Sequence, residues 1–179
     1  LAGMTSLDLG NNLVASLAGG LFRDTRSLRV LTLRDNELTE LHAGDFGGVE
    51  ASLEHLDLSH NPLVSLHPDV LRGMTSLKRL YLSSTRLATL PSGLFRSLER
   101  LEELHLSDNE MLAGLPAELL KPLTALRVLA VTGNGVLPCL PMEAARFAQA
   151  GTSFLYEGPQ RCVLCTADDP AAGCKCDQG

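Results

Sequence analysis

One motif recurs six times along this chain, and each copy aligns with the next without gaps. The copies begin 24, 25, 24, 24 and 25 residues apart. All follow the pattern L-x-x-L-x-L-x-x-N-x-L with at most two substitutions, and their first residues are Met4, Leu28, Leu53, Leu77, Leu101 and Leu126. Self-similarity at a fixed period of this length predicts an array of stacked units, whose core grows with each unit.

The L-x-L segment of each copy alternates apolar and polar residues, which indicates a short strand with one buried face. Such a strand cannot bury its own leucines, so neighbouring units are expected to stack in register as a parallel sheet. Asn recurs where the chain leaves five of these strands, at Asn12, Asn36, Asn61, Asn109 and Asn134. A buried amide can satisfy backbone groups of the turn, so we expect a ladder of amides whose weakest rung is Thr85.

Three of the five phenylalanines, Phe22, Phe46 and Phe95, fall at one position of the repeat, where the third unit has Leu71. They predict an apolar spine on the side of the array opposite the sheet. The core must otherwise be aliphatic, because aromatic residues make up only 4 % of the chain.

The motif resembles the leucine-rich repeat family over about residues 1–136. Its 24-residue period and Phe spine are similar to the subclass found mainly in extracellular proteins, including Toll-like receptors, lamprey variable lymphocyte receptors and matrix proteoglycans. The resemblance implies an α/β fold, namely a curved, right-handed leucine-rich repeat solenoid with a parallel β-sheet on its concave side and a small cysteine-rich C-terminal cap. It also implies an extracellular or cell-surface location, with the concave face as the usual binding surface.

The pattern divides the chain into three segments. Residues 1–136 hold six recognisable repeats, residues 137–161 are predicted to form a C-terminal cap, and residues 162–179 form a cysteine-rich segment that reads as the start of a further module. The N-terminal cap usual in this subclass is missing, so three apolar side chains are expected to face solvent unless a partner or preceding repeats cover them: Met4, Leu7 and Leu9. We therefore expect further repeats or modules at both ends.

All five cysteines lie in the last quarter of the chain: Cys139, Cys162, Cys165, Cys174 and Cys176. Three interpretations are open. A disulfide-bonded cap leading into an EGF-like unit suits the terminal C-x-C-x-x-G, a zinc knuckle suits four thiolates, and redox chemistry suits the C-x-x-C pair. We adopt the disulfide interpretation, without a metal, and the pairing is unknown. Since five is an odd number, at least one cysteine stays free or pairs outside this chain.

The residue after the first leucine of each repeat forms a column across the predicted sheet. From the second unit onward its charges alternate, in the order Arg29, Glu54, Lys78, Glu102 and Arg127. Adjacent strands lie about 4.8 Å apart, so this charge column predicts a ladder of cross-strand ion pairs, with ligand contact as the alternative role.

Two further columns on the third, fourth and fifth strands combine into a two-by-three group of polar side chains around the one concave aromatic residue. We call this group the Tyr81 patch, and its members are His55, Asp57, Arg79, Tyr81, Glu103 and His105. Tyr and Arg are enriched in binding hot spots, so the group is a candidate protein-binding patch, with an ordinary polar surface as the alternative. A metal site is not expected, because the two histidines lie about 10 Å apart by strand spacing.

Several classes of function are disfavoured. The net charge of −6 argues against nucleic acid, and no apolar run approaches the ~18 residues that cross a bilayer, so no membrane insertion is expected within the chain. Motifs of serine hydrolases, zinc proteases, P-loops and dinucleotide-binding folds are absent, so we expect neither enzymatic activity nor a cofactor. Asp57 and His105 could belong to a catalytic triad only if Tyr81 did not lie between them in the expected register.

Two hypotheses of function follow. The first is a non-catalytic extracellular recognition module, part of a longer protein, that binds a protein partner on its concave face through the Tyr81 patch. The second is a structural building block of an extracellular matrix, wall or surface assembly, which contacts its neighbours through its ends and flanks. An intracellular scaffold is a third interpretation, and it requires the cysteines to be reduced or zinc-bound.

Overall fold

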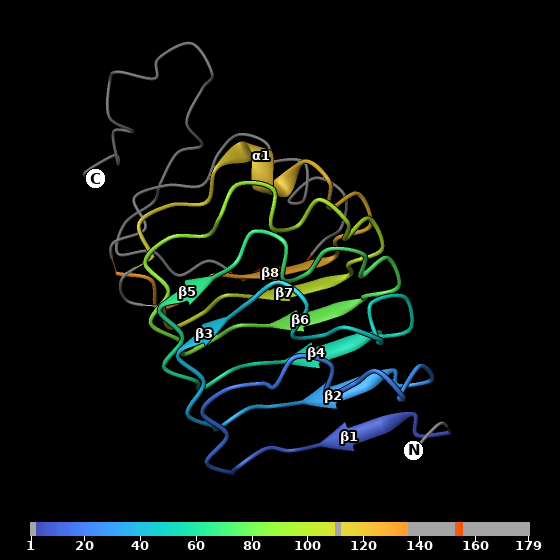
Figure 1. The fold of residues 1–179 in the computed structure, drawn as a ribbon. Coiled ribbons are helices and arrows are strands. Elements are labelled where there is room, and N and C mark those ends of the chain that lie inside the picture. The colour runs from blue at the N-terminus through green and yellow to red at the C-terminus, as the bar shows by residue number, and fades with distance from the viewer. Residues whose placement is uncertain (1–2, 110–111, 136–152, 156–179) are drawn as a thin grey trace, which may run out of the picture.

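The computed structural model describes residues 3–109, 112–135 and 153–155. Seven short parallel strands form one sheet and follow each other in chain order, so the chain winds as a solenoid (Figure 1). The strands are β1 (Ser6–Asp8), β2 (Val30–Thr32), β4 (His55–Asp57), β6 (Arg79–Tyr81), β7 (Glu103–His105), β8 (Val128–Ala130) and β9 (Ser153–Leu155). The predicted leucine-rich repeat solenoid with a parallel sheet is confirmed, and each of the first six strands begins two residues into one copy of the motif.

The leucine at the centre of each repeat fixes the register of the sheet. Leu7 pairs with Leu31, Leu31 with Leu56, and the pairing continues in the same way to Leu129. From the second strand to the sixth these central leucines have an exposed fraction of 0 %. One sheet face is therefore buried in the core, and the residues on either side of each central leucine form straight columns on the other.

The predicted spine forms opposite the sheet. Phe22, Phe46 and Phe95 are buried, as is Leu71 in the same position, and the rings of Phe22 and Phe46 stack with centroids 6.2 Å apart. These side chains close the core against the sheet leucines, which confirms the prediction.

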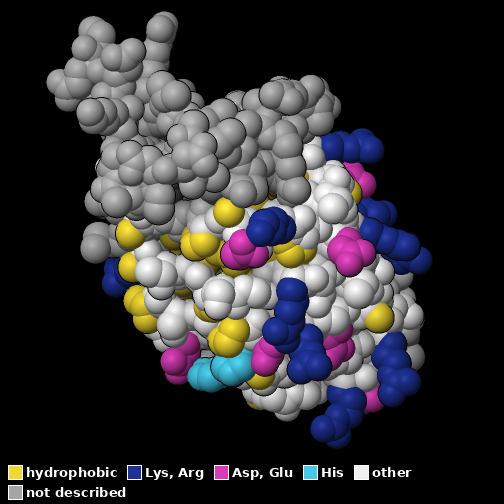
Figure 2. All heavy atoms as spheres, turned by 90° about the horizontal axis from the view of Figure 1, so that it is seen from above, with side chains coloured by type: hydrophobic (Ala, Val, Ile, Leu, Met, Phe, Trp, Pro, Cys, Tyr) yellow, Lys and Arg dark blue, Asp and Glu magenta, His cyan; other side chains and the backbone are white. Residues whose placement is uncertain are grey.

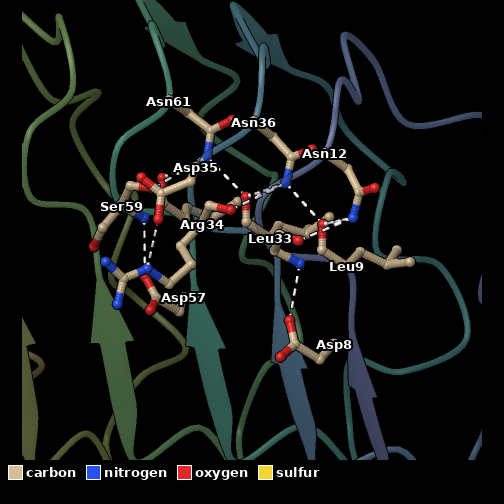
Figure 3. Close-up of polar contacts among 12 residues, drawn as sticks. Asp8, Leu9, Asn12, Leu33, Arg34, Asp35, Asn36, Asp57, Ser59 and Asn61 are labelled. Atoms are coloured by element: carbon tan, nitrogen blue, oxygen red, sulfur yellow. Dashed lines mark hydrogen bonds and ion pairs between the residues drawn. The ribbon is translucent and has the colours of Figure 1, made fainter.

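The asparagine ladder is also present (Figure 3). The side-chain amide of Asn36 donates to the carbonyl of Leu33 in its own unit and to that of Leu9 in the preceding unit, over 3.0 and 2.9 Å. Its carbonyl oxygen accepts the backbone N–H of Val14 over 3.0 Å. From Asn36 onward, each asparagine of the ladder thus ties two successive turns of the solenoid together.

Thr85 interrupts this ladder on one side. Its backbone N–H donates to Asn109 over 2.9 Å and its hydroxyl also contacts Asn109, so the link to the fifth unit is kept. Within the described residues, Thr85 forms no bond to the carbonyl of Leu58, although an asparagine there would have reached it by analogy with Asn36. The expected weak rung therefore lies between the third and fourth units.

Four elements were not predicted from the sequence. A second, two-stranded parallel sheet pairs β3 (Glu40–Leu41) with β5 (Ser65–Leu66), and one turn of helix, α1, spans Ala117–Leu120. Strand β9 extends the main sheet beyond the last recognised repeat, with Phe154 in register with Leu129. The segment predicted as a C-terminal cap therefore contributes one further strand to the sheet. The rest of the predicted cap, residues 137–152 and 156–161, and all five cysteines lie outside the described residues.

The first unit is less buried than those that follow. Met4, Leu7 and Leu9 are half-buried and pack against the core, which corrects the expectation that they face solvent. Their counterparts one unit later, Leu28, Leu31 and Leu33, are completely buried. The difference arises because Leu28 to Leu33 have a solenoid turn on both sides among the described residues.

Candidate binding surface

The exposed face of the sheet carries the six residues of the Tyr81 patch on β4, β6 and β7. The register pairs His55 with Arg79 and Arg79 with Glu103. It also pairs Asp57 with Tyr81 and Tyr81 with His105. All six residues are half-buried, so the structure places them in the predicted two-by-three arrangement with their side chains partly open to solvent.

Three rings lie against one another at the centre of this patch. The ring centroid of Tyr81 is 5.1 Å from that of His55 and 4.4 Å from that of His105, with interplanar angles of 48° and 44°. Tilted rings at these distances attract one another beyond the effect of burial alone. The Tyr81 ring is therefore held between its neighbours, which reduces the entropy it would lose on binding a ligand.

Two hydrogen bonds connect the charged members of the patch to these rings. Arg79 donates its Nε–H to Nδ1 of His55 over 3.1 Å, and the Tyr81 hydroxyl donates to Oε2 of Glu103 over 2.9 Å. Nε2 of His105 lies 3.7 Å from the same glutamate oxygen, too far for a hydrogen bond. It is buried and has no hydrogen-bond partner within the described part of the chain.

The surroundings shift the pKa of all three rings. Burial, together with the hydrogen bond to Glu103 and its negative charge, raises the pKa of Tyr81 to about 12. Burial lowers the pKa of His55, and the charge of Arg79 lowers it further. Burial also lowers the pKa of His105, although Glu103 opposes this effect. At neutral pH the three rings are therefore uncharged and present amphipathic surface between the charges of Arg79, Asp57 and Glu103.

Titration of Tyr81 tests this geometry. In a Tyr156→Phe background, which removes the second of the two tyrosines, the ultraviolet absorbance of the phenolate should appear with a midpoint near 12. Glu103→Gln should lower the midpoint but leave it above the ordinary value of 10, because the effect of burial remains. A midpoint near 10 in the Tyr156→Phe protein, with circular dichroism still showing a folded chain, would contradict the arrangement.

The charge column is only partly paired. Glu54 accepts from Lys78 over 2.7 Å and from Arg29 over 2.8 Å, and the Lys78 hydrogen bond is the main reason that the pKa of Glu54 is lowered. Among the described residues, Glu102 forms no ion pair with Lys78 or with Arg127. The predicted ladder is therefore confirmed for its first three charges and wrong for Glu102 and Arg127.

Asp57 has a local role that the sequence analysis missed. Its Oδ1 accepts the backbone N–H of Ser59 over 2.9 Å, and Asp8 accepts that of Gly10 over 2.8 Å in the same way (Figure 3). The available signal was an aspartate two residues before the small residue of the turn, which occurs in the first and third units. One oxygen of Asp57 thus supports the turn, and the other forms no hydrogen bond with the described residues.

Asp57 and His105, the two patch residues that could belong to a catalytic triad, are kept apart by the register of the sheet. Tyr81 lies between Asp57 and His105 in the register, as expected, so these two side chains lack the direct contact of a catalytic relay. Within the described ranges, no three His, Cys, Asp or Glu side chains are grouped in a way that could hold a metal ion. In the same ranges, no helix has the length and apolar character needed to span a membrane.

Solenoids of stacked repeats with one open sheet face form a class of proteins that use this extended surface for binding. A family model described as leucine rich repeat matches residues 2–63, 50–87 and 75–136. These matches cover more than half of the sequence, and the chain belongs to the leucine-rich repeat family.

Similar curated proteins match only a part of the chain. Leucine-rich repeat-containing protein 3B of Danio rerio is 41 % identical over 63 residues, which are 35 % of this chain and 24 % of that protein. Human Toll-like receptor 5 is 40 % identical over 70 residues, which are 39 % of this chain and 8 % of the receptor. The matched stretch thus spans about a quarter or less of the length of these relatives.

Solved structures support the fold. One described as a TLR13–ssRNA13 complex aligns with a TM-score of 0.63 and 27 % identity, over 76 % of this chain and 21 % of that chain. A Toll–Spätzle complex from Drosophila aligns with a TM-score of 0.60 and 22 % identity, over 88 % of this chain and 27 % of that chain. The second likeness concerns the fold alone.

Proposed function

We propose that this chain is a non-catalytic recognition module, outside the cell or at its surface, that binds a protein partner on the exposed sheet face through the Tyr81 patch. The observation that carries the proposal is the contact of three uncharged rings, flanked by Arg79, Asp57 and Glu103 on adjacent strands. Rigid amphipathic rings with charges beside them are typical of residues that dominate binding energy in protein interfaces.

The relatives support this function. Toll-like receptor 5 supports a receptor-type, extracellular setting, and the Toll–Spätzle complex is an example of this fold with a bound protein. The TLR13 complex holds RNA, but this chain has a net charge of −6, and the patch has two carboxylates against one arginine, which disfavours a polyanion on this face.

Affinity measurements on patch variants test the proposal. A library of secreted and cell-surface ectodomains, screened against the immobilised full chain, supplies the partner. Tyr81→Ala should then weaken its binding by at least about thirtyfold, because truncating a central interface tyrosine costs about 2 kcal/mol or more. Thr32→Ala, two strands away on the same face, is the matched control and should change affinity less than threefold by comparison.

The alternative function, a building block of an extracellular assembly, predicts a different result in the same assay. The described surface has its most exposed large apolar side chain at Leu13, which is 81 % exposed in the first unit, far from the patch. If Tyr81→Ala bound the partner as well as the unchanged chain while Leu13→Ser did not, the contact would lie at the end of the solenoid. That result would replace recognition on the sheet face with assembly through the flank.

A further inference from the structure

A second surface runs along the edge of the solenoid where the strands begin. A groove of about 490 Å³ crosses the first three to four units there, lined by Gly3, Thr5, Arg26, Ser27, Arg29, Ala51, Ser52, Glu54 and Ser76. A further groove of about 480 Å³ is lined by Thr75, Arg96, Ser97, Glu99 and Arg100. Thr75 and Ser76 are consecutive, so the two grooves adjoin, and we call them together the edge groove.

The edge groove is basic although the chain as a whole is acidic. Its lining contains four arginines and two glutamates, a balance of +2, against a net charge of −6 for the chain. One of the glutamates, Glu54, is already held between Arg29 and Lys78. Lys and Arg side chains gather on the right of Figure 2, the side on which the strands begin in Figure 1.

Several hydrogen-bond donors in this groove have no acceptor among the described residues. Arg29 and Arg96 are paired with Glu54 and Asp69, whereas Arg26 and Arg100 form no ion pair with any described residue. Four hydroxyl groups of the lining likewise form no hydrogen bond within the described part, namely those of Thr5, Ser27, Thr75 and Ser76. The groove therefore offers guanidinium and hydroxyl donors in a row, which is the chemistry that binds oxyanions.

The spacing and composition of these donors identify the kind of anion. Arg26 precedes β2 and Arg100 precedes β7, three strand positions apart, so the donors extend over about 14 Å and suit a chain of anionic groups. No aromatic side chain is among the described residues that line the groove, so nucleic-acid bases have nothing to stack on. Free hydroxyls beside arginines match a ligand that carries both oxyanions and hydroxyl groups.

We propose that the edge groove binds a sulfated polysaccharide, with Arg26 and Arg100 as the principal contacts. The ligand lies across successive turns of the solenoid, its sulfate groups accept from the two guanidinium groups, and its hydroxyls pair with the Ser and Thr side chains between them. This site is separate from the Tyr81 patch, and its existence does not depend on the protein partner proposed above.

Binding of the full chain to an immobilised heparin dodecasaccharide tests this site. The unchanged chain should bind, and its affinity should fall as salt is raised, because ion contacts are screened. Arg26→Ser with Arg100→Ser should weaken binding about tenfold or more. Arg34→Ser with Arg86→Ser is the matched control, since it removes two exposed arginines outside the groove, and it should weaken binding less than threefold at the same net charge.

Three outcomes would overturn the proposal. They are absence of binding by the unchanged chain, an equal loss in the two double variants, and binding of single-stranded DNA or poly-glutamate of matched charge as tight as that of the dodecasaccharide. All four changed residues are exposed, so circular dichroism and urea unfolding should show that both variants fold. Tyr81→Ala should leave dodecasaccharide binding unchanged, which separates failure of this site from failure of the sheet-face proposal.

Discussion

Asn61→Ala is expected to lower the free energy of unfolding by about 4 kcal/mol, because two buried backbone groups would lose the only partners that they have among the described residues. Asn61 is 1 % exposed, its side-chain oxygen accepts from the N–H of Leu38 over 3.0 Å, and its amide donates to the carbonyl of Leu58 over 3.0 Å. Thr85 of the next unit forms no hydrogen bond with the Leu58 carbonyl within the described residues, so it would not replace the second of these bonds. Urea unfolding followed by circular dichroism measures the loss.

Asn12→Ala is the matched control for this prediction. Asn12 has the same place in the first unit, but it is exposed, and the carbonyl of Leu9 that it reaches also accepts from Asn36. Water can satisfy whatever this change leaves unpaired, so the expected cost is below about 1 kcal/mol. Equal losses of unfolding free energy in the two variants would contradict this prediction. They would show that each asparagine stabilises only its own unit, and that burial between turns adds nothing.

The fold could be predicted from the sequence because the repeat specifies both the period and the register. Once Leu31 and Leu56 occupy the same place in successive turns, every residue between them is assigned to a column. For this reason the cross-strand neighbours of Tyr81 were predicted correctly as Asp57 and His105. The solenoid, the spine and the asparagine ladder could be predicted from the same repeat period.

Features that depend on one side chain's choice among partners could not be predicted. The column alone does not say that Lys78 pairs with Glu54 and leaves Glu102 aside, or that Tyr81 donates to Glu103. Rotamers and competing partners decide such contacts, and they do not repeat with the motif. Strand β9 was not predicted for another reason, because only Phe154 and Leu155 match the leucine positions of the motif there. The repeat length was the remaining signal, since Ser153 follows Val128 by one repeat length.

In the second repeat, the structure requires a glycine at position 48, which the leucine motif does not predict. Gly48 has φ of +109°, and a Cβ placed on it would lie 2.5 Å from the carbonyl oxygen of Phe22 and 2.8 Å from the Cα of Arg23. Those atoms belong to the backbone of the preceding turn, at the base of the Phe spine. Two solenoid turns therefore approach so closely here that only a glycine fits.

Gly48→Ala is accordingly expected to lower the free energy of unfolding by about 3–4 kcal/mol, from backbone strain and from separation of the two turns. Gly44→Ala isolates the first of these effects, because Gly44 has φ of +89° but no atom within 4 Å of the new Cβ, and it should cost about 1 kcal/mol. Gly19→Ala, with neither constraint, should change stability by less than about 0.5 kcal/mol. Urea unfolding of the three variants gives the order, and a Gly48 variant no less stable than the Gly44 variant would mean that the turns can separate at little cost. In that case the spine, and not backbone contact between turns, would set the spacing of the solenoid at this point.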